Sequence, residues 1–185
     1  MQSKIYTSAL IAVFAVSVFF SSCKKDLTVS FDKSFPGLNL VLDTTSHTGT
    51  FTISQANINT GISAFASSNG FSVNNIKSVV IKSCTIGIAD TTNPIASRIT
   101  FDALDSIKAT LSSTGLTDMK IGTVNPMPHT GLTSITLNLN NADVTSFIKA
   151  SQFSYVVTGA NNAPITHKLP MTASVTFTIS ASITK

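Results

Sequence analysis

The sequence predicts an all-β protein, an antiparallel sandwich of two sheets with one or two short helices. Strict alternation of apolar and polar side chains from Leu169 to Ile183 is typical of a strand with one buried and one wet face. Shorter alternating runs recur between turn-forming Asn, Gly and Pro residues. Ser and Thr make up 52 of the 185 residues, which suits the solvent faces of strands, where Thr is favoured.

Each expected strand has its own alternating run. The runs are Val29 and Phe31, Phe51 and Ile53, Ile107 to Leu111, Ile135 to Leu139, and Phe153 to Val157. Residues 76 to 90 hold two runs that are out of phase, and a β-bulge near Lys82-Ser83 would bring both onto one face. The run from Leu169 to Ile183 is long enough that we expect it to bend and pass from one sheet to the other.

Two short helices are expected between the strands. Asp143 is suited to cap a helix from Val144 to Lys149. Its inward-facing residues would be Val144, Phe147 and Ile148. Ser54 would open a second helix through Ile58 and Ile62, although Gly61 disfavours it.

Composition excludes several classes of protein. The chain is 43% hydrophobic and 11% charged, which is too apolar for a disordered protein. The net charge of +4 is spread along the chain, so we expect no nucleic-acid partner. The length allows one ordinary domain once an export segment is removed, and we expect that domain to span residues 27–185.

The N-terminus has the features of an export signal. Lys4 gives a positive start, and residues 9–20 form an apolar run broken only by Ser17. A membrane-spanning helix needs about 20 apolar residues, so this run of 12 predicts the core of a signal peptide. We expect residues 1–22 to be that signal peptide.

The segment Phe20-Ser21-Ser22-Cys23 resembles the lipobox of bacterial lipoproteins, in the loose form common in Bacteroidota. It departs from the usual pattern at Phe20, where Leu is commonest. The resemblance implies cleavage before Cys23, a diacylglycerol thioether on its sulfur and acylation of the new amine. Residues 23–26 would then be the lipidated N-terminus and a short tether. The alternative is ordinary cleavage that leaves Cys23 as a plain thiol.

The resemblance also covers the body of the chain. The stretches KSVVIKSCTIGIAD, FDALDSIKATLSSTGL and VTSFIKAS are similar to those of small Bacteroidota lipoproteins with an immunoglobulin-like β-sandwich and no assigned function. This implies attachment to the outer membrane through the lipid. Surface-exported relatives usually carry consecutive acids after the Cys, whereas Lys24-Lys25-Asp26 has one. A periplasmic and an outward-facing location therefore both stay open, as does the oligomeric state.

The remaining residues carry little sign of chemistry. Cys84 lies in an apolar run, IKSCTIGI, and is expected to be a buried small hydrophobe. The three histidines, His47, His129 and His167, lack metal-ligand spacing and are expected in surface loops. Asp102 or Asp105 is expected to cap a turn before the Ile107 strand. We assign no catalytic residue, no metal and no cofactor.

Three short stretches resemble the acceptor of the Bacteroidota O-glycosylation system, in which Asp precedes Ser or Thr and then an aliphatic residue or Thr. The candidate sites are Thr44, Thr91 and Ser106. Thr44 and Thr91 lie in expected loops, where a sugar is tolerated, whereas Ser106 is expected to be partly buried.

Three functions are consistent with these features. We expect a non-enzymatic, lipid-anchored envelope protein whose sandwich binds an unidentified protein or glycan partner. The alternative is an adhesin or fimbrillin-like subunit, in which the long terminal strand completes a neighbour's sheet. The second alternative is a hydrolase with a deep pocket that gathers one of the histidines with an Asp.

Overall fold

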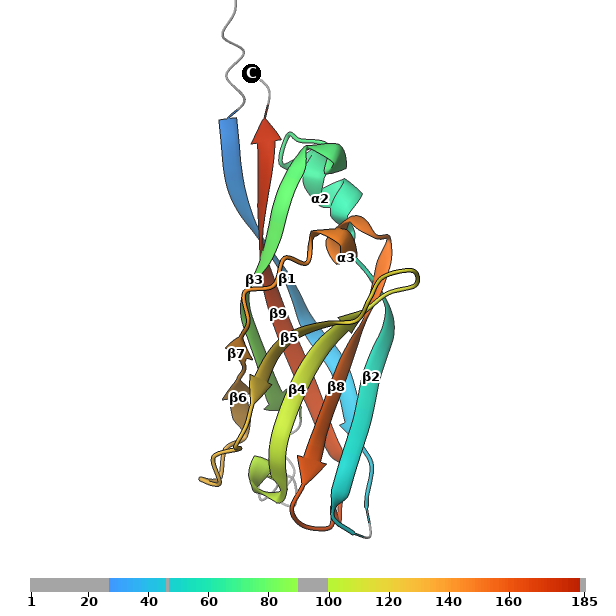
Figure 1. Ribbon diagram of the computed structural model, residues 1–185, viewed down its shortest axis with the longest axis vertical. Coiled ribbons are helices and arrows are strands. Elements are labelled where there is room, and N and C mark those ends of the chain that lie inside the picture. Colours follow the sequence, from blue (N-terminus) through green and yellow to red (C-terminus); the bar gives the residue numbers. More distant parts are fainter. Residues whose placement is uncertain (1–26, 46, 90–99, 184–185) are drawn as a thin grey trace, which may run out of the picture.

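The computed structural model describes residues 27–45, 47–89 and 100–183, which form an elongated sandwich of two antiparallel sheets (Figure 1). The first sheet has the order β1-β9-β3-β6 and the second β2-β8-β4-β5-β7. The strands are β1 (Leu27–Leu42), β2 (Gly49–Asn59), β3 (Ile76–Ile88), β4 (Leu104–Ser112), β5 (Met119–Val124), β6 (Ser134–Thr136), β7 (Asn138–Leu139), β8 (Gln152–Asn161) and β9 (Leu169–Ile183). The predicted all-β sandwich is confirmed, with the two-sheet architecture that immunoglobulin-like domains share.

Strand β9 is an interior strand of the first sheet, between β1 and β3. It pairs with β1 from Leu169 to Ile183 and with β3 from Met171 to Ala181, and its odd-numbered residues from Leu169 to Ala181 are buried. Its extent matches the predicted strand. The expectation that it changes sheets is wrong, because the irregularities lie in its neighbours: β1 between Phe35 and Leu38, and β3 near Lys82.

The bulge in β3 is where the sequence predicted it. The register between β3 and β9 shifts between Ile81 and Ser83, so Lys82 is the extra residue. Val79 and Ile81 before the bulge, and Cys84 and Ile86 after it, are all buried. One inserted residue therefore keeps both out-of-phase runs on the core face.

The change of sheet occurs instead after Ile135. Strand β6 pairs with β3 in the first sheet, and β7 pairs with β5 in the second, with Leu137 between them. The alternating residues Ile135 and Leu137 are both buried, so the segment closes this side of the sandwich with apolar side chains. Strand β5 was not predicted, because its buried residues Ile121 and Val124 do not alternate cleanly around a bulge.

The helix expected from Ser54 is wrong. Strand β2 continues to Asn59, because Ile53 pairs with Val157 and Ile58 with Phe153. A register shift between Gln55 and Ile58 moves the apolar residues to a spacing that resembles a helix. The helix α2 (Ile62–Ser68) begins only after Gly61, whose positive φ of 55° ends the strand.

The second helix is close to its predicted place. Helix α3 (Thr145–Lys149) follows Asp143, whose carboxylate accepts a hydrogen bond from the Thr145 N–H at 2.9 Å. Hydrogen bonding to the carboxylate lowers the Asp143 pKa. The residues that the sequence predicted to face inward from this helix are all buried: Val144, Phe147 and Ile148.

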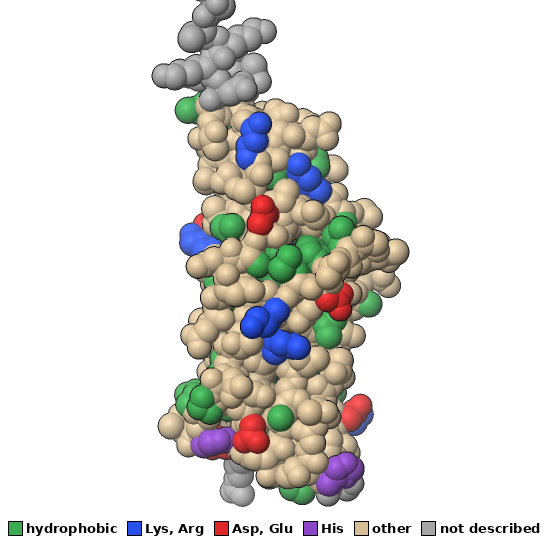
Figure 2. Space-filling view, viewed as in Figure 1, with side chains coloured by type: hydrophobic (Ala, Val, Ile, Leu, Met, Phe, Trp, Pro, Cys, Tyr) green, Lys and Arg blue, Asp and Glu red, His purple; other side chains and the backbone are tan. Residues whose placement is uncertain are grey.

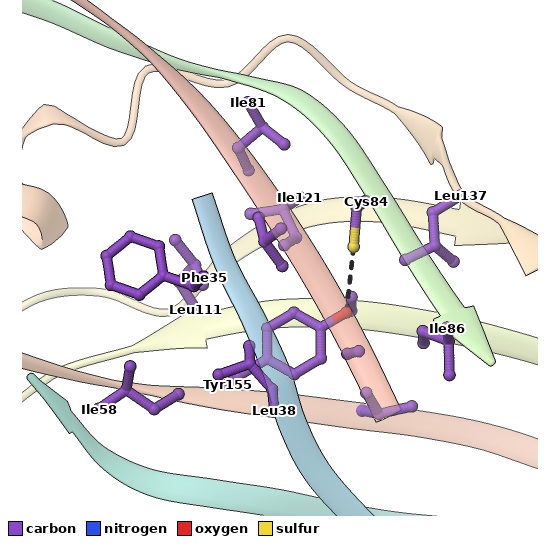
Figure 3. Close-up of a cluster of buried hydrophobic side chains, with 14 of the residues drawn as sticks. Phe35, Leu38, Ile58, Ile81, Cys84, Ile86, Leu111, Ile121, Leu137 and Tyr155 are labelled. Atoms are coloured by element: carbon purple, nitrogen blue, oxygen red, sulfur yellow. Dashed lines mark hydrogen bonds between the residues drawn. The ribbon is translucent and has the colours of Figure 1, made fainter. Parts of the chain in front are cut away.

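The middle of the sandwich holds one polar contact in an apolar core. Cys84 on β3 and Tyr155 on β8 are fully buried, and the Cys84 sulfur lies 3.1 Å from the Tyr155 hydroxyl oxygen (Figure 3). The contact joins the two sheets. Aliphatic side chains such as Ile81, Ile86 and Leu137 surround it.

The two ends of the sandwich differ in structure. At the helix end, defined as residues 27–33, 60–80, 143–151 and 177–183, α2 lies beside the start of β1, and α3 packs against β3 and β8 (Figure 1). At the loop end, defined as the described residues of 42–50, 101–106, 125–134 and 159–170, the strands are joined by turns. No helix among the described residues has the length and hydropathy needed to span a membrane.

Candidate functional site

Asn161 ties two loops together at the loop end. It is 4% exposed, and its side-chain nitrogen donates to the Thr45 hydroxyl at 3.3 Å and to the carbonyls of His47 and Ala163 at 3.1 and 2.8 Å. Thr45 and Ile165 exchange two further hydrogen bonds. Asn161 was missed by the sequence reasoning, although a polar residue on the inward side of β8 was the available signal.

Asp102 ties together the other loops at this end. It lies in the single turn η3 (Phe101–Ala103) directly before β4, and both its carboxylate oxygens accept from the Gly131 N–H at 3.0 and 3.2 Å. The cap of that turn is Thr100, whose hydroxyl accepts from the Asp102 N–H. The predicted turn exists, but Asp102 fixes a neighbouring loop instead of capping its own turn, and Asp105 is exposed at the start of β4.

A hollow of about 390 Å³ opens between these loops. Buried Ile165 and Leu169 line it together with exposed Thr166 and His167, and Asp102 also borders it. The hollow therefore combines an apolar surface with hydrogen-bonding groups, which is the usual composition of a binding site.

The three histidines are all exposed, as expected of surface loops, and the topology brings all three to the loop end, where Figure 2 shows histidine side chains. His129 donates from Nδ1 to the main-chain carbonyl of Asp102 at 2.9 Å, so the ring is not directed at the Asp102 carboxylate. Within the described ranges, no group of three His, Cys, Asp or Glu side chains is arranged to hold a metal ion.

The buried thiol is held in an unreactive state. Desolvation raises the pKa of Cys84 to about 11, although its contact with Tyr155 acts in the opposite direction. Burial raises the Tyr155 pKa well above its usual value, and the neighbouring Cys84 raises it further. A nucleophilic cysteine needs a lowered pKa and access to solvent, and Cys84 has neither.

The candidate modification sites differ in accessibility. Thr44 is exposed in the loop between β1 and β2, beside Asp43, which pairs with Lys168 at 3.0 Å. Ser106 is half-buried in β4, where it borders a second hollow of about 370 Å³ on the outer face of the second sheet. Cys23, Thr91 and the expected signal peptide 1–22 lie outside the described residues.

Comparison with known proteins adds no assignment. No protein-family model matches the chain, and no match was found among curated proteins. Functional inference therefore depends on the chemistry of the described body and on the N-terminal sequence.

Proposed function

We propose that this protein is a lipid-anchored, non-enzymatic lipoprotein of the cell envelope whose sandwich binds a partner through its loop end. The observation that carries the proposal is the position of Cys84. Its fully buried sulfur faces Tyr155 between the sheets, so a disulfide to Cys23 would require the core to open. Of the two cysteines in the chain, Cys23 is then the one available for modification.

The start of the first strand supports the same proposal. Strand β1 begins at Leu27, which leaves Lys24-Lys25-Asp26 between Cys23 and the sandwich. Two or more acyl chains on Cys23 are enough for stable membrane attachment, whereas one chain binds reversibly. A folded domain directly after the anchor suits a protein that is held at a membrane surface without spanning it.

The position of β9 argues against strand donation as the mode of action. Its whole length pairs with β1, and most of it also pairs with β3, so a donated β9 would have to leave both partners. The exposed edge strand β1 carries Pro36 and a register shift, and it points Lys33 inward. Such features protect an edge from pairing with another chain.

Metabolic labelling tests the anchor. Cells that express the protein are grown with a clickable palmitate, and we expect labelling to be lost in Cys23→Ala and kept in Cys84→Ala, the matched control. Persistent labelling of Cys23→Ala would refute the anchor assignment.

The direction in which the body faces is tested separately. Protease is added to intact cells, with a periplasmic control protein and a detergent-lysed sample. Cleavage in intact cells shows an outward-facing body, and protection until lysis shows a periplasmic one.

A further inference from the structure

We propose that the helix end rests on the headgroup layer of the membrane that holds the anchor, so that the loop end is presented away from the membrane. This inference rests on the proposed lipid anchor at Cys23. It adds a second membrane contact, made by the folded body itself, and an orientation of the molecule.

The chain between the anchor and the fold is short. Leu27 is four residues after Cys23, and four residues of extended chain span at most about 14 Å. Strand β9 has 15 residues, so the long axis of the sandwich measures about 50 Å. The tether is therefore much shorter than the body, and the end that carries Leu27 must stay close to the lipid surface.

The helix end exposes both apolar and basic side chains. Among the described residues, Leu27 is the most exposed of three exposed large hydrophobic side chains, at 52%, and it pairs with Ile183 at the tip of the first sheet. Lys77 is exposed in the same region, at the start of β3. Lys149 is also exposed, and its ammonium group donates to the Ile76 carbonyl at 3.0 Å. An exposed Leu beside lysines suits the boundary between acyl chains and anionic headgroups.

The two ends of the sandwich carry net charges of opposite sign. The described helix end, with Lys82 of the adjoining bulge, has four lysines and two aspartates, a net charge of +2. These residues are Lys33, Lys77, Lys82, Lys149, Asp32 and Asp143. The described loop end has one lysine and three aspartates, a net charge of −2. These residues are Lys168, Asp43, Asp102 and Asp105. An anionic membrane surface attracts the first end and repels the second.

The helix end is also firmly packed. The Phe31 ring stacks on Phe71 with centroids 5.1 Å apart, and Phe65 meets Phe71 edge-on at 6.3 Å. Lys33 covers the cluster, with its ammonium group 5.0 Å from the Phe65 ring centroid, and burial lowers its pKa. The membrane contact would therefore set the orientation of a rigid body.

Fluorescence energy transfer to the membrane tests the orientation. The lipidated full-length protein is placed in phosphatidylglycerol-containing vesicles with an acceptor dye on the lipid. A donor dye is attached at Ser68→Cys in the helix end or at Thr130→Cys in the loop end; both positions are exposed, and the buried thiol of Cys84 is protected from the dye. We expect at least two-fold more transfer from position 68 than from position 130.

Equal transfer from the two positions, with the protein still floating with the vesicles, would overturn the orientation and leave the anchor intact. Failure to float would overturn the anchor and the orientation together.

A lengthened tether tests the contact made by the body. Twenty Gly and Ser residues are inserted after Asp26, so that the tether no longer imposes the orientation. Lys77→Glu should then reduce transfer from position 68 by about half, whereas Lys108→Glu, an equal charge change on exposed β4, should leave it unchanged. An equal response to the two substitutions would contradict a lipid contact at the helix end.

Discussion

The helix end and the loop end are built on different interactions. At the helix end, three phenylalanine rings, those of Phe31, Phe65 and Phe71, lie within 6.4 Å of one another between centroids. At the loop end, the turns are joined by hydrogen bonds to Asn161 and Asp102. When a substitution exposes apolar surface, the free energy of unfolding falls in proportion to the area exposed. A buried hydrogen-bonding group lowers the free energy of unfolding only when its partner is removed.

This difference matches the roles that we propose for the two ends. An end held by rings packed on one another keeps its shape without its polar groups, so its surface is free to meet lipid. An end held by a few hydrogen bonds leaves His167, Thr166 and the neighbouring hollow open to a partner.

The largest expected effect is at Gly159 of β8, where the second sheet meets the loop end. A Cβ atom there would lie 2.2 Å from the Ser106 carbonyl oxygen and 2.6 Å from the Phe51 ring. Because one of the obstructing atoms belongs to the backbone, Gly159→Ala should lower the free energy of unfolding by about 4 kcal/mol. Gly87→Ala is the control, since its nearest contact is at 3.7 Å and its loss should stay under about 1 kcal/mol. Urea unfolding measures both, and equal losses would contradict the predicted clash.

The next effect is at the helix end. Phe71 is 7% exposed and contacts both other rings, so Phe71→Ala should cost about 3 kcal/mol. Val80→Ala, at 38% exposure on β3, should cost well under about 1 kcal/mol. Hydrogen exchange should show faster opening of α2 in Phe71→Ala while the amides of the loop end stay protected. Loosening of both ends together would show that the ends are not independent.

The core between the ends should weaken at high pH. The Cys84 pKa is raised from 9.0 to about 11, so the folded state holds the thiol proton more tightly than the unfolded state. This contribution is complete below pH 9 and is lost as pH rises towards 11, by about 2 kcal/mol at that point. Cys84→Ser should remove the loss between pH 9 and 10, leaving the fall due to Tyr155 at higher pH. An unchanged pH profile of thermal unfolding in Cys84→Ser would contradict this assignment.

The smallest effect is at the loop end itself. Asn161→Ala removes a buried side-chain amide whose two N–H groups are shared among Thr45, His47 and Ala163, and it should cost about 1.5 kcal/mol. Exposed Asn162 donates one side-chain hydrogen bond within the described residues, to the Asp102 carbonyl at 3.3 Å, so Asn162→Ala should cost less than about 0.5 kcal/mol. Thermal unfolding compares the two variants. A larger loss in Asn162→Ala would place the support of these loops elsewhere.

Much of the fold could be predicted because alternation reports burial directly. The extent of β9 and the bulge at Lys82 both follow from which residues must face the core. A helix was wrongly predicted from Ser54, inside strand β2. The reason is a bulge near Asn57, which changes the spacing of apolar residues although the segment remains a strand. Which sheet a strand joins depends on contacts distant in sequence, so the crossing at Leu137 carried no local signal.

The candidate site was less predictable for the same reason. Exposure of the three histidines followed from their Gly-, Pro- and Thr-rich surroundings, but their gathering at one end depends on topology. The contact between Cys84 and Tyr155 joins two residues that are 71 positions apart in the sequence. The inward-facing Asn161 broke the apolar pattern of β8, and that local irregularity was the available sign of its role.

Mass spectrometry of the mature N-terminus shows whether a lipid on Cys23 holds this body at a membrane. Protein extracted from membranes with detergent is digested, and its first peptide is identified. We expect a peptide that begins at Cys23 and carries a diacylglycerol thioether with an acylated amine. A peptide that continues from Ser22 into Cys23, or one with an unmodified Cys23 thiol, would contradict it.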